Sequence, residues 1–283
     1  MSNSVSSSDG VSPDPDLPTS VSGDSNHNSA GNIPATPKGK PLGGSAYGSI
    51  PHLPGSRRGP GDRGLSESQA NILTLKARDR HDVIIVQEKL DGSCCSVARL
   101  ADGEIVPLTR RGFVADTSPF QQHHAWHRWV LRHAARFEAL LKPGERCVGE
   151  WLMEAHGTRY NLPHEPFVIF DIIANNKRLT VEEVTRRTQA PECSFTMPRL
   201  IHAGGPLSIE AVLSVLEPSG HGALDPVEGA VWRAERRGVV DFLGKYVIAS
   251  KEDGKYLSEF SGNPSIYNWQ EAVDPAVPET PGQ

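Results

Sequence analysis

The chain has 283 residues, a formal net charge of −5 and four cysteines. A chain of this length can bury a substantial core, and its modest negative charge excludes a uniformly basic surface, so any nucleic-acid partner must be met by a local groove. The cysteines show no CxxC spacing, which favours reduced thiols in an intracellular, cytoplasmic protein. We find no secretory signal and no apolar stretch long enough to span a membrane.

Composition divides the chain into three parts. Residues 1–45 are rich in Ser, Gly and Pro with only scattered apolar side chains, so they cannot bury enough apolar surface to offset their ordering entropy. We therefore expect a disordered N-terminal tail. Residues 46–269 are expected to form one folded domain, and residues 270–283 a flexible C-terminal tail.

Alternating and β-branched runs predict strands along the domain. The clearest run is Val83–Val86, which is typical of a strand buried on both faces. The turns Ala101-Asp-Gly103 and Glu235-Arg-Arg-Gly238 indicate two hairpins. In chain order, we expect strands at 83–86, 95–100, 104–109, 146–153, 167–173, 228–234 and 239–248.

Periodic apolar side chains and capping residues predict the helices. One apolar stripe, which includes Trp126 and Phe137, predicts a single helix over residues 121–141, and Ser208 and Thr180 are placed to cap two more. In chain order, we expect helices at 66–77, at 121–141, from Thr180 onwards and at 208–216. Because hairpins occur as often as strands separated by helices, the expected fold class is α+β, with mainly antiparallel sheets and flanking helices.

Lys89-Leu-Asp-Gly92 directly follows the buried strand. A lysine at the end of such a strand is expected to be partly desolvated, which disfavours the ammonium form and lowers the lysine pKa. A neutral amine is a nucleophile, and Gly92 allows the sharp turn that would aim it into a cleft. On these residues alone, a surface lysine before an Asp-Gly turn explains the motif equally well.

Taken with motifs that follow it in order, this segment resembles the covalent nucleotidyltransferase superfamily, which contains DNA ligases, RNA ligases and mRNA capping enzymes. The matching segments are Lys89-Leu-Asp-Gly92, Thr109-Arg-Arg-Gly112, Gly149-Glu-Trp151, Phe167-Val-Ile-Phe-Asp171, Glu228-Gly-Ala-Val-Trp-Arg233 and Lys245-Tyr-Val247. Each segment is short, but their order and spacing make the resemblance specific.

The resemblance implies a nucleotidyltransferase (ligase adenylation) domain in which Lys89 attacks ATP and carries AMP as a phosphoramidate. It implies that Glu150 holds the ribose, that Phe170 stacks on the purine and that Lys245 contacts the α-phosphate. Glu228 and Glu150 are the candidate ligands for Mg²⁺ or Mn²⁺, since magnesium prefers one or two carboxylates together with substrate oxygens. The full set of candidate ATP- or AMP-binding residues is Glu88, Asp91, Arg110, Glu150, Phe170, Glu228 and Lys245.

Structural roles remain open for several of these side chains. Glu150 and Glu228 would also suit strand-end salt bridges, Phe170 a core position and Lys245 a solvated edge. Strand alternation favours Phe167, on the opposite face from Phe170, as the core residue.

Two departures from the superfamily pattern concern its cations. Val247 stands where a second lysine is common, and Ser93-Cys94 lacks the arginine that DNA ligases usually carry after the nucleophile. Only about 30 residues follow Lys251, too few for an oligonucleotide-binding barrel. We therefore expect no C-terminal OB barrel, which favours the RNA-ligase branch.

Two further segments look like those of a bacterial group of RNA-ligase-like proteins. They are His52-Leu-Pro-Gly-Ser-Arg57 and His156-Gly-Thr-Arg-Tyr160. His156, Arg159 and Lys251 are candidates for contact with RNA or phosphate, although ordinary loop positions would explain the first two equally well.

The expected function is that of an ATP-dependent RNA ligase, which forms lysyl-AMP and seals RNA 5′-phosphate ends to 3′-hydroxyl ends. One alternative is a DNA ligase or a guanylyltransferase that uses GTP. Another is a non-catalytic sensor of nucleotides or RNA ends that retains the fold, although a sensor has no need of a nucleophilic lysine. The sequence leaves the physiological RNA and the oligomeric state open.

Overall fold

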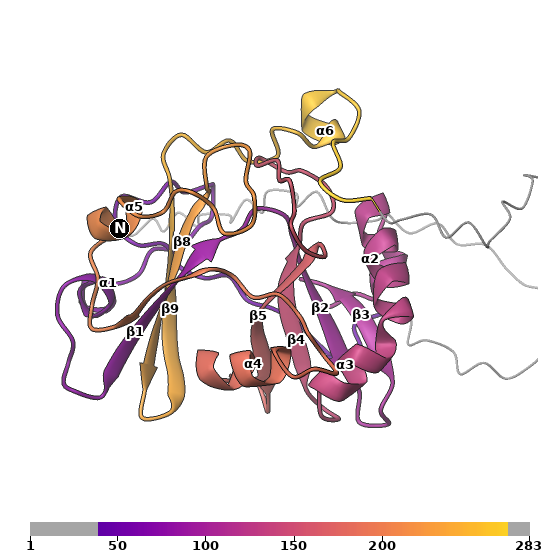
Figure 1. Cartoon of the computed structure of the whole chain (residues 1–283), viewed down its shortest axis with the longest axis horizontal. Coiled ribbons are helices and arrows are strands. Elements are labelled where there is room, and N and C mark those ends of the chain that lie inside the picture. The colour runs from indigo at the N-terminus through magenta and orange to yellow at the C-terminus, as the bar shows by residue number, and fades with distance from the viewer. Residues whose placement is uncertain (1–38, 271–283) are drawn as a thin grey trace, which may run out of the picture. The chain divides into compact units, whose positions relative to one another are not determined.

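Two antiparallel sheets build the protein in the computed structural model, which describes residues 39–270 (Figure 1). Sheet A has the strand order β7-β1-β8-β9, and sheet B has the order β3-β2-β4-β5-β6. The strands are β1 (Asp82–Lys89), β2 (Ser93–Arg99), β3 (Ile105–Thr109), β4 (Arg146–Trp151), β5 (Phe167–Ala174), β6 (Lys177–Arg178), β7 (Leu200–Gly204), β8 (Gly229–Arg236) and β9 (Val239–Val247). The α+β class with mainly antiparallel sheets is confirmed, and so are both predicted hairpins, β2–β3 and β8–β9.

The helices are short. They are α1 (Glu67–Thr74), α2 (Gln121–Arg132), α3 (Ala134–Leu140), α4 (Val181–Thr188), α5 (Ile209–Leu213) and α6 (Ser258–Ser261), with a 3₁₀ turn at Ala115–Thr117. Ser66, Thr180 and Ser208 each cap a helix by accepting a hydrogen bond from the backbone N–H three residues further on. Among the described residues, no helix is long and apolar enough to cross a bilayer.

The single helix expected over residues 121–141 is wrong, because the chain breaks at His133. The His133 N–H is shared between the carbonyl oxygens of Trp129 at 3.2 Å and Val130 at 3.0 Å, and its ring Nδ1 also lies 2.8 Å from the Trp129 oxygen. The helix therefore tightens and restarts as α3. Trp126 and Phe137, on either side of the break, are both buried, so the apolar stripe continues across it and conceals it in the sequence.

Each sheet packs on its own helices (Figure 1). Sheet A forms a core with α1 and α5 that includes Leu73, Trp232 and Val212. Sheet B forms a second core with α2 and α3, in which Trp126 and Trp151 are fully buried. The chain first passes from sheet A to sheet B between the end of β1 and the start of β2, and the Lys89-Leu-Asp-Gly92 motif makes this crossing.

Both predicted tails lie largely outside the described residues. Of the segment 1–45 only residues 39–45 are described, and of the segment 270–283 only residue 270. In the described part, the Gly43 N–H donates to the Lys40 carbonyl oxygen at 2.8 Å, and Leu42 packs against a small core beneath β2 and β3.

Candidate active site

Lys89 ends β1 at the crossing between the two sheets. Its Nζ atom lies 2.6 Å from Oε2 of Glu228 and donates to the Leu90 carbonyl oxygen at 3.2 Å. The register of the strands explains the pairing, because Lys89 lies opposite Gly229, the residue directly after Glu228. A Cβ atom at position 229 would overlap the Tyr246 carbonyl oxygen, so a glycine is needed for β8 to begin this close to β9.

The charge state of Lys89 differs from the expectation. Burial by itself would lower the pKa of Lys89, but the carboxylates of Glu228 and Glu150 outweigh burial and raise this pKa above its ordinary value. The expected lowering of the Lys89 pKa is therefore wrong for the protein without a substrate. The amine is therefore held as an ammonium ion beside the Glu228 carboxylate.

Glu150, on β4, belongs to the same cluster. Its Oε1 atom accepts a hydrogen bond from the Gly92 N–H at 3.0 Å. Burial raises the pKa of Glu150 to about 7, with the Glu228 carboxylate adding to this effect and Lys89 opposing it. Glu150 and Glu228 together form a donor set that suits Mg²⁺, which takes one or two carboxylates along with substrate oxygens. No cluster of three or more metal-ligating side chains occurs in the described range 39–270.

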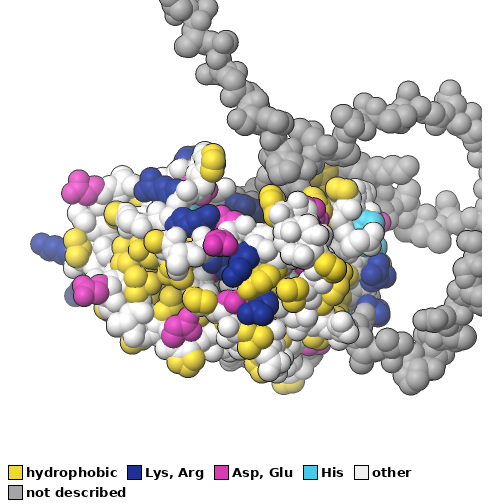
Figure 2. Space-filling model, turned by 90° about the horizontal axis from the view of Figure 1, so that it is seen from above, with side chains coloured by type: hydrophobic (Ala, Val, Ile, Leu, Met, Phe, Trp, Pro, Cys, Tyr) yellow, Lys and Arg dark blue, Asp and Glu magenta, His cyan; other side chains and the backbone are white. Residues whose placement is uncertain are grey.

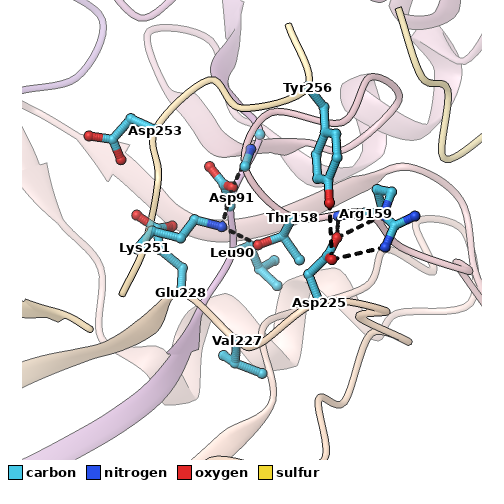
Figure 3. Close-up of polar contacts among 12 residues, drawn as sticks. Leu90, Asp91, Thr158, Arg159, Asp225, Val227, Glu228, Lys251, Asp253 and Tyr256 are labelled. Carbon is cyan, nitrogen blue, oxygen red and sulfur yellow. Dashed lines mark hydrogen bonds and ion pairs between the residues drawn. The ribbon is translucent and has the colours of Figure 1, made fainter. Parts of the chain in front are cut away.

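The turn of the nucleophile motif is held by later segments of the chain. The Asp91 carboxylate accepts a hydrogen bond from the Gly157 N–H at 2.8 Å and lies 2.6 Å from the Lys251 ammonium group. Lys251 also contacts the Thr158 hydroxyl, and Figure 3 shows the ammonium group between these two partners. The Asp91 N–H donates to the Tyr160 hydroxyl at 3.0 Å. Lys251 is buried by this arrangement and serves the turn from within the protein.

Phe170 lies half-buried on β5. Its ring centroid is 5.3 Å from that of Tyr47, and Cys94 packs in the same cluster. Cys94 lies opposite Glu150 in the register of β2 and β4, so Phe170 and Glu150 occupy neighbouring positions of sheet B. Phe167 is buried, as strand alternation predicted.

Asp171, directly after Phe170, joins the two sheets. Its fully buried carboxylate accepts hydrogen bonds from Arg233 of β8 at 2.6 Å, from Arg178 at 3.1 Å and from the Tyr47 hydroxyl at 2.5 Å. The same guanidinium nitrogen of Arg233 donates to the Phe170 carbonyl oxygen at 3.2 Å. The backbone that carries Phe170 is thereby fixed relative to sheet A.

Lys245 and Arg110 add positive charge from the two sheets. Burial and the neighbouring Lys89 ammonium group both lower the pKa of Lys245, and Arg110 lies within electrostatic reach of it. Arg110 follows β3, is exposed, and donates to the Ser49 hydroxyl at 2.8 Å. Lys245 therefore lies in the electrostatic field of Lys89, and Arg110 adds positive charge from the other sheet.

Glu88 is the predicted site residue that the structure separates from the others. Because side chains alternate along a strand, Glu88 lies on the opposite face of β1 from Lys89. Its carboxylate accepts hydrogen bonds from the Ser219 hydroxyl and from the Gly220 N–H, the latter at 2.8 Å. This contact anchors the loop before β8 to the end of β1.

His156 and Arg159 lie on the loop that follows β4. The Nε2 atom of His156 lies 3.2 Å from the Gln122 side-chain oxygen, at the start of α2. Arg159 makes a two-point ion pair with Asp225 at 2.9 and 3.0 Å, and its guanidinium group lies 5.1 Å from the centre of the Tyr256 ring (Figure 3). The Arg159 side chain is 42% exposed, at the rim of the cluster.

Sequence patterns did not identify several residues that hold this site together. Tyr160 stood within a segment that had been singled out, but nothing indicated that its hydroxyl would bind the turn. Tyr47 and Ser219 gave no signal at all, because each acts through a contact more than 100 positions away along the chain.

Figure 2 shows that Lys and Arg side chains alternate with Asp and Glu side chains in the middle of the face seen from above.

The family is established by comparison with known protein families. The model of a family described as RNA ligase matches residues 82–247, which is more than half of the 283 residues. The matched segment contains Lys89, Glu150, Glu228 and Lys245. The chain belongs to the RNA ligase family.

Similar solved structures include an archaeal ATP-dependent RNA ligase, which is 23% identical with a TM-score of 0.38 over 59% of this chain and 42% of that one. A mutant of Naegleria gruberi RNA ligase with AMP and Mn is 17% identical, with a TM-score of 0.45 over 77% of this chain and 63% of that one. Another mutant of the same ligase, with ATP and Mn, is 15% identical, with a TM-score of 0.44 over 72% and 60% of the two chains. This chain thus spans less than two thirds of each of them. No curated protein matches it.

Proposed function

We propose that this protein is an ATP-dependent RNA ligase in which Lys89 is the catalytic nucleophile. The observation that carries the proposal is the partly buried Lys89–Glu228 pair at 2.6 Å, with Glu150 beside it, at the crossing of the two sheets. When the carboxylates around such a lysine bind another cation, the pKa of the lysine falls and its charge can change.

In this proposal Glu228 and Glu150 hold a divalent cation that enters with ATP. When bound, Mg²⁺ or Mn²⁺ neutralises charge on the phosphate oxygens and polarises the phosphorus that is attacked. Because the carboxylates then face a stronger cation than Lys89, the pKa of Lys89 falls and its amine can lose a proton. Phe170 stacks on the adenine ring, Lys245 binds the α-phosphate, and Arg110 contacts the nucleotide or the strand end.

The proposed reaction has three steps. The Lys89 Nζ atom attacks the α-phosphorus of ATP, the bond to the β-phosphate oxygen breaks, and pyrophosphate leaves. The AMP then passes to an RNA 5′-phosphate, which frees Lys89 and leaves an adenylated end. Finally, an RNA 3′-hydroxyl attacks that end, forms the phosphodiester and releases AMP. Positioning and neutralisation of phosphate charge are the main demands of such transfers.

Further roles are proposed for the rim and the ends of the chain. Arg159 and His156 are proposed RNA contacts, and Arg159 could exchange Asp225 for an RNA phosphate. Lys251 could reach a phosphate only by leaving Asp91, so we assign it first to holding the turn. We propose a cytoplasmic location, in keeping with the free thiols of the four cysteines, and an adenylation domain that spans residues 46–269 between two tails.

The function is tested with nucleotides that carry a label on the α-phosphate. The full chain is incubated with Mg²⁺ and labelled ATP or, separately, labelled GTP, and is then given 5′-phosphorylated RNA or DNA strands. We expect covalent label from ATP alone, its transfer to the RNA 5′ end as an adenylate, and its release as labelled AMP when the RNA strands are joined. Label from GTP alone would favour a guanylyltransferase, preferential joining of DNA would favour a DNA ligase, and no label with either nucleotide would favour a sensor.

A further inference from the structure

Arg57 lies beside the end of β9, on a segment that runs along the free edge of this strand. Within segment 50–57, the Leu53 N–H donates to the Lys245 carbonyl oxygen at 2.8 Å, and the Arg57 N–H donates to the Val247 carbonyl oxygen at 3.0 Å. The segment therefore extends sheet A at the strand that carries Lys245. The main-chain contact places the Cα atom of Arg57 next to Val247.

Buried side chains hold this segment in place. His52 is buried, its Nδ1 atom lies 2.7 Å from the Ser56 hydroxyl, and its Nε2 atom lies 3.0 Å from the Asp62 carboxylate. The Ser56 oxygen also accepts a hydrogen bond from the Val247 N–H at 2.9 Å. The position of Arg57 is thus determined by a network that uses both backbone and side chains, and its own side chain takes no part in it.

The Arg57 side chain itself is only loosely engaged. Its Nη1 atom donates a hydrogen bond to the Asp253 carboxylate at 2.6 Å, and the Asp253 side chain is 66% exposed. Exposed ion pairs of this kind contribute little to stability. A guanidinium group has five N–H donors and binds phosphate in a two-point geometry. An arriving phosphate could therefore replace Asp253 readily.

Two observations connect the Arg57 guanidinium group with the cluster around Lys89: its charge and the geometry of β9. The hydrogen bond that Arg57 donates to Asp253, together with the nearby Glu228 and Glu252 carboxylates, raises the pKa of Arg57, so Arg57 is a cation within electrostatic reach of Glu228. Tyr246 and Ile248 pack on the core of sheet A, which places Lys245 and Val247 together on the other face of β9.

Val247 is apolar and only 5% exposed. On this face of β9 the strand therefore offers one cation, Lys245, to a bound phosphate group, and Val247 stands where a second cation would contact the same group. We propose that Arg57 supplies this second cation and binds a phosphate of the nucleotide alongside Lys245. The inference rests on the proposed function, because it assumes that a nucleoside triphosphate occupies the cluster around Lys89. It assigns a ligand-binding role to a segment that lies before the matched family region.

The test measures equilibrium binding of an ATP analogue with a methylene group between the α- and β-phosphates, which cannot transfer AMP, in the presence of Mg²⁺. The full chain is compared with Arg57→Gln and with the matched variant Asp253→Asn, which breaks the same ion pair but keeps the guanidinium group. We expect Arg57→Gln to weaken binding by about 10- to 100-fold, the loss typical of a hydrogen bond to a charged group, and Asp253→Asn to bind at least as tightly as the wild type.

Two results would overturn the inference. One is unchanged binding in Arg57→Gln. The other is an equal loss in Asp253→Asn, which would mean that the ion pair only holds the loop after β9 in place.

Joining of RNA that already carries a 5′-adenylate, without ATP, distinguishes a phosphate of the nucleotide from a phosphate of the RNA strand. A loss confined to that reaction would assign Arg57 to the RNA strand and contradict a nucleotide contact. Covalent labelling with ATP in the same samples reports separately on the proposed function, since wild type that binds the analogue without ever forming an adduct would contradict the ligase alone.

Discussion

The two sheets contribute to the candidate site in different ways. Sheet A supplies Lys89, Glu228 and Lys245 from strand ends whose register alone brings them together. Sheet B supplies Glu150, which the Gly92 N–H holds, and Phe170, whose position depends on side-chain contacts made by Asp171 and Tyr47. We propose that Lys89 and Glu228 on sheet A serve the chemical step, whereas Phe170 on sheet B holds the nucleotide. Changes at Lys89 or Glu228 should therefore impair the chemical step, and changes at Phe170 should impair binding.

The largest expected effect is a loss of stability when the Asp171 contact between the two sheets is removed. Asp171→Asn removes the charge that compensates the buried Arg233 guanidinium group, and breaking one partner of a buried pair costs about 3–5 kcal/mol. Urea denaturation should show a loss of this size in the free energy of unfolding. Glu138→Gln, an exposed position on α3, should change it little. A loss in Asp171→Asn no greater than in this control would mean that the two sheets are joined by other contacts.

On sheet A, Glu228→Gln should slow formation of the AMP adduct by about 10²–10³-fold, the usual effect of removing one preorganised electrostatic group. The variant also frees Lys89 from its ion pair, which by itself favours the neutral amine. A slower reaction would therefore show that holding the cation matters more than releasing the lysine. Single-turnover labelling with saturating ATP measures the rate, with the distant Glu210→Gln as control. A faster reaction in Glu228→Gln would contradict the metal role.

On sheet B, Phe170→Ala should weaken ATP binding by about 10- to 100-fold, since stacking of a base on an aromatic ring contributes about 1–3 kcal/mol. The rate at saturating ATP should change much less. Phe170→Leu keeps much of the apolar volume but removes the flat ring, and it should behave like the alanine variant if stacking is the cause. The Michaelis constant for ATP in the labelling assay provides the measurement. If the maximal rate falls while that constant is unchanged, the division of labour between the sheets is wrong.

The last effect concerns the proton on Glu150. Its pKa is raised from 4.5 to about 7, mainly by burial, so between these pH values the folded protein binds more protons at this site than the unfolded chain does. Stability from this group is therefore present below about pH 4.5 and is lost as the pH rises to about 7, by at most about 1.4 kcal/mol per pH unit. Glu150→Gln does not titrate, so the wild type should lose stability relative to this variant across that window. Chemical denaturation at several pH values tests this, and parallel curves for the two proteins would contradict it.

Much of the fold could be predicted from local sequence, because hairpin turns and helix caps act within a few residues. Ser66, Thr180 and Ser208 cap helices as expected. The edge strand β7 was not predicted, since its short, partly exposed sequence shows no alternation and forms a strand only by pairing with β1. The break at His133 was also missed, because the apolar stripe has the same spacing on both sides of it.

The site was predicted as a set of residues, but its electrostatics was not. Motif order placed Lys89, Glu150 and Glu228 in one cluster, as the structure does. The direction of the Lys89 pKa shift was wrong because burial acts locally, whereas the carboxylate that outweighs it comes from position 228, on another strand. Glu88, next to Lys89 in the sequence, is turned away by strand alternation.

The central claim is that the Lys89 amine becomes covalently joined to AMP. Intact mass spectrometry of the full chain after incubation with ATP and Mg²⁺, followed by peptide mapping, tests this directly. We expect the mass of one AMP on the peptide that contains Lys89, and no such gain in Lys89→Ala protein that remains folded by circular dichroism. AMP on a different residue, or an adduct that persists in Lys89→Ala, would contradict the account.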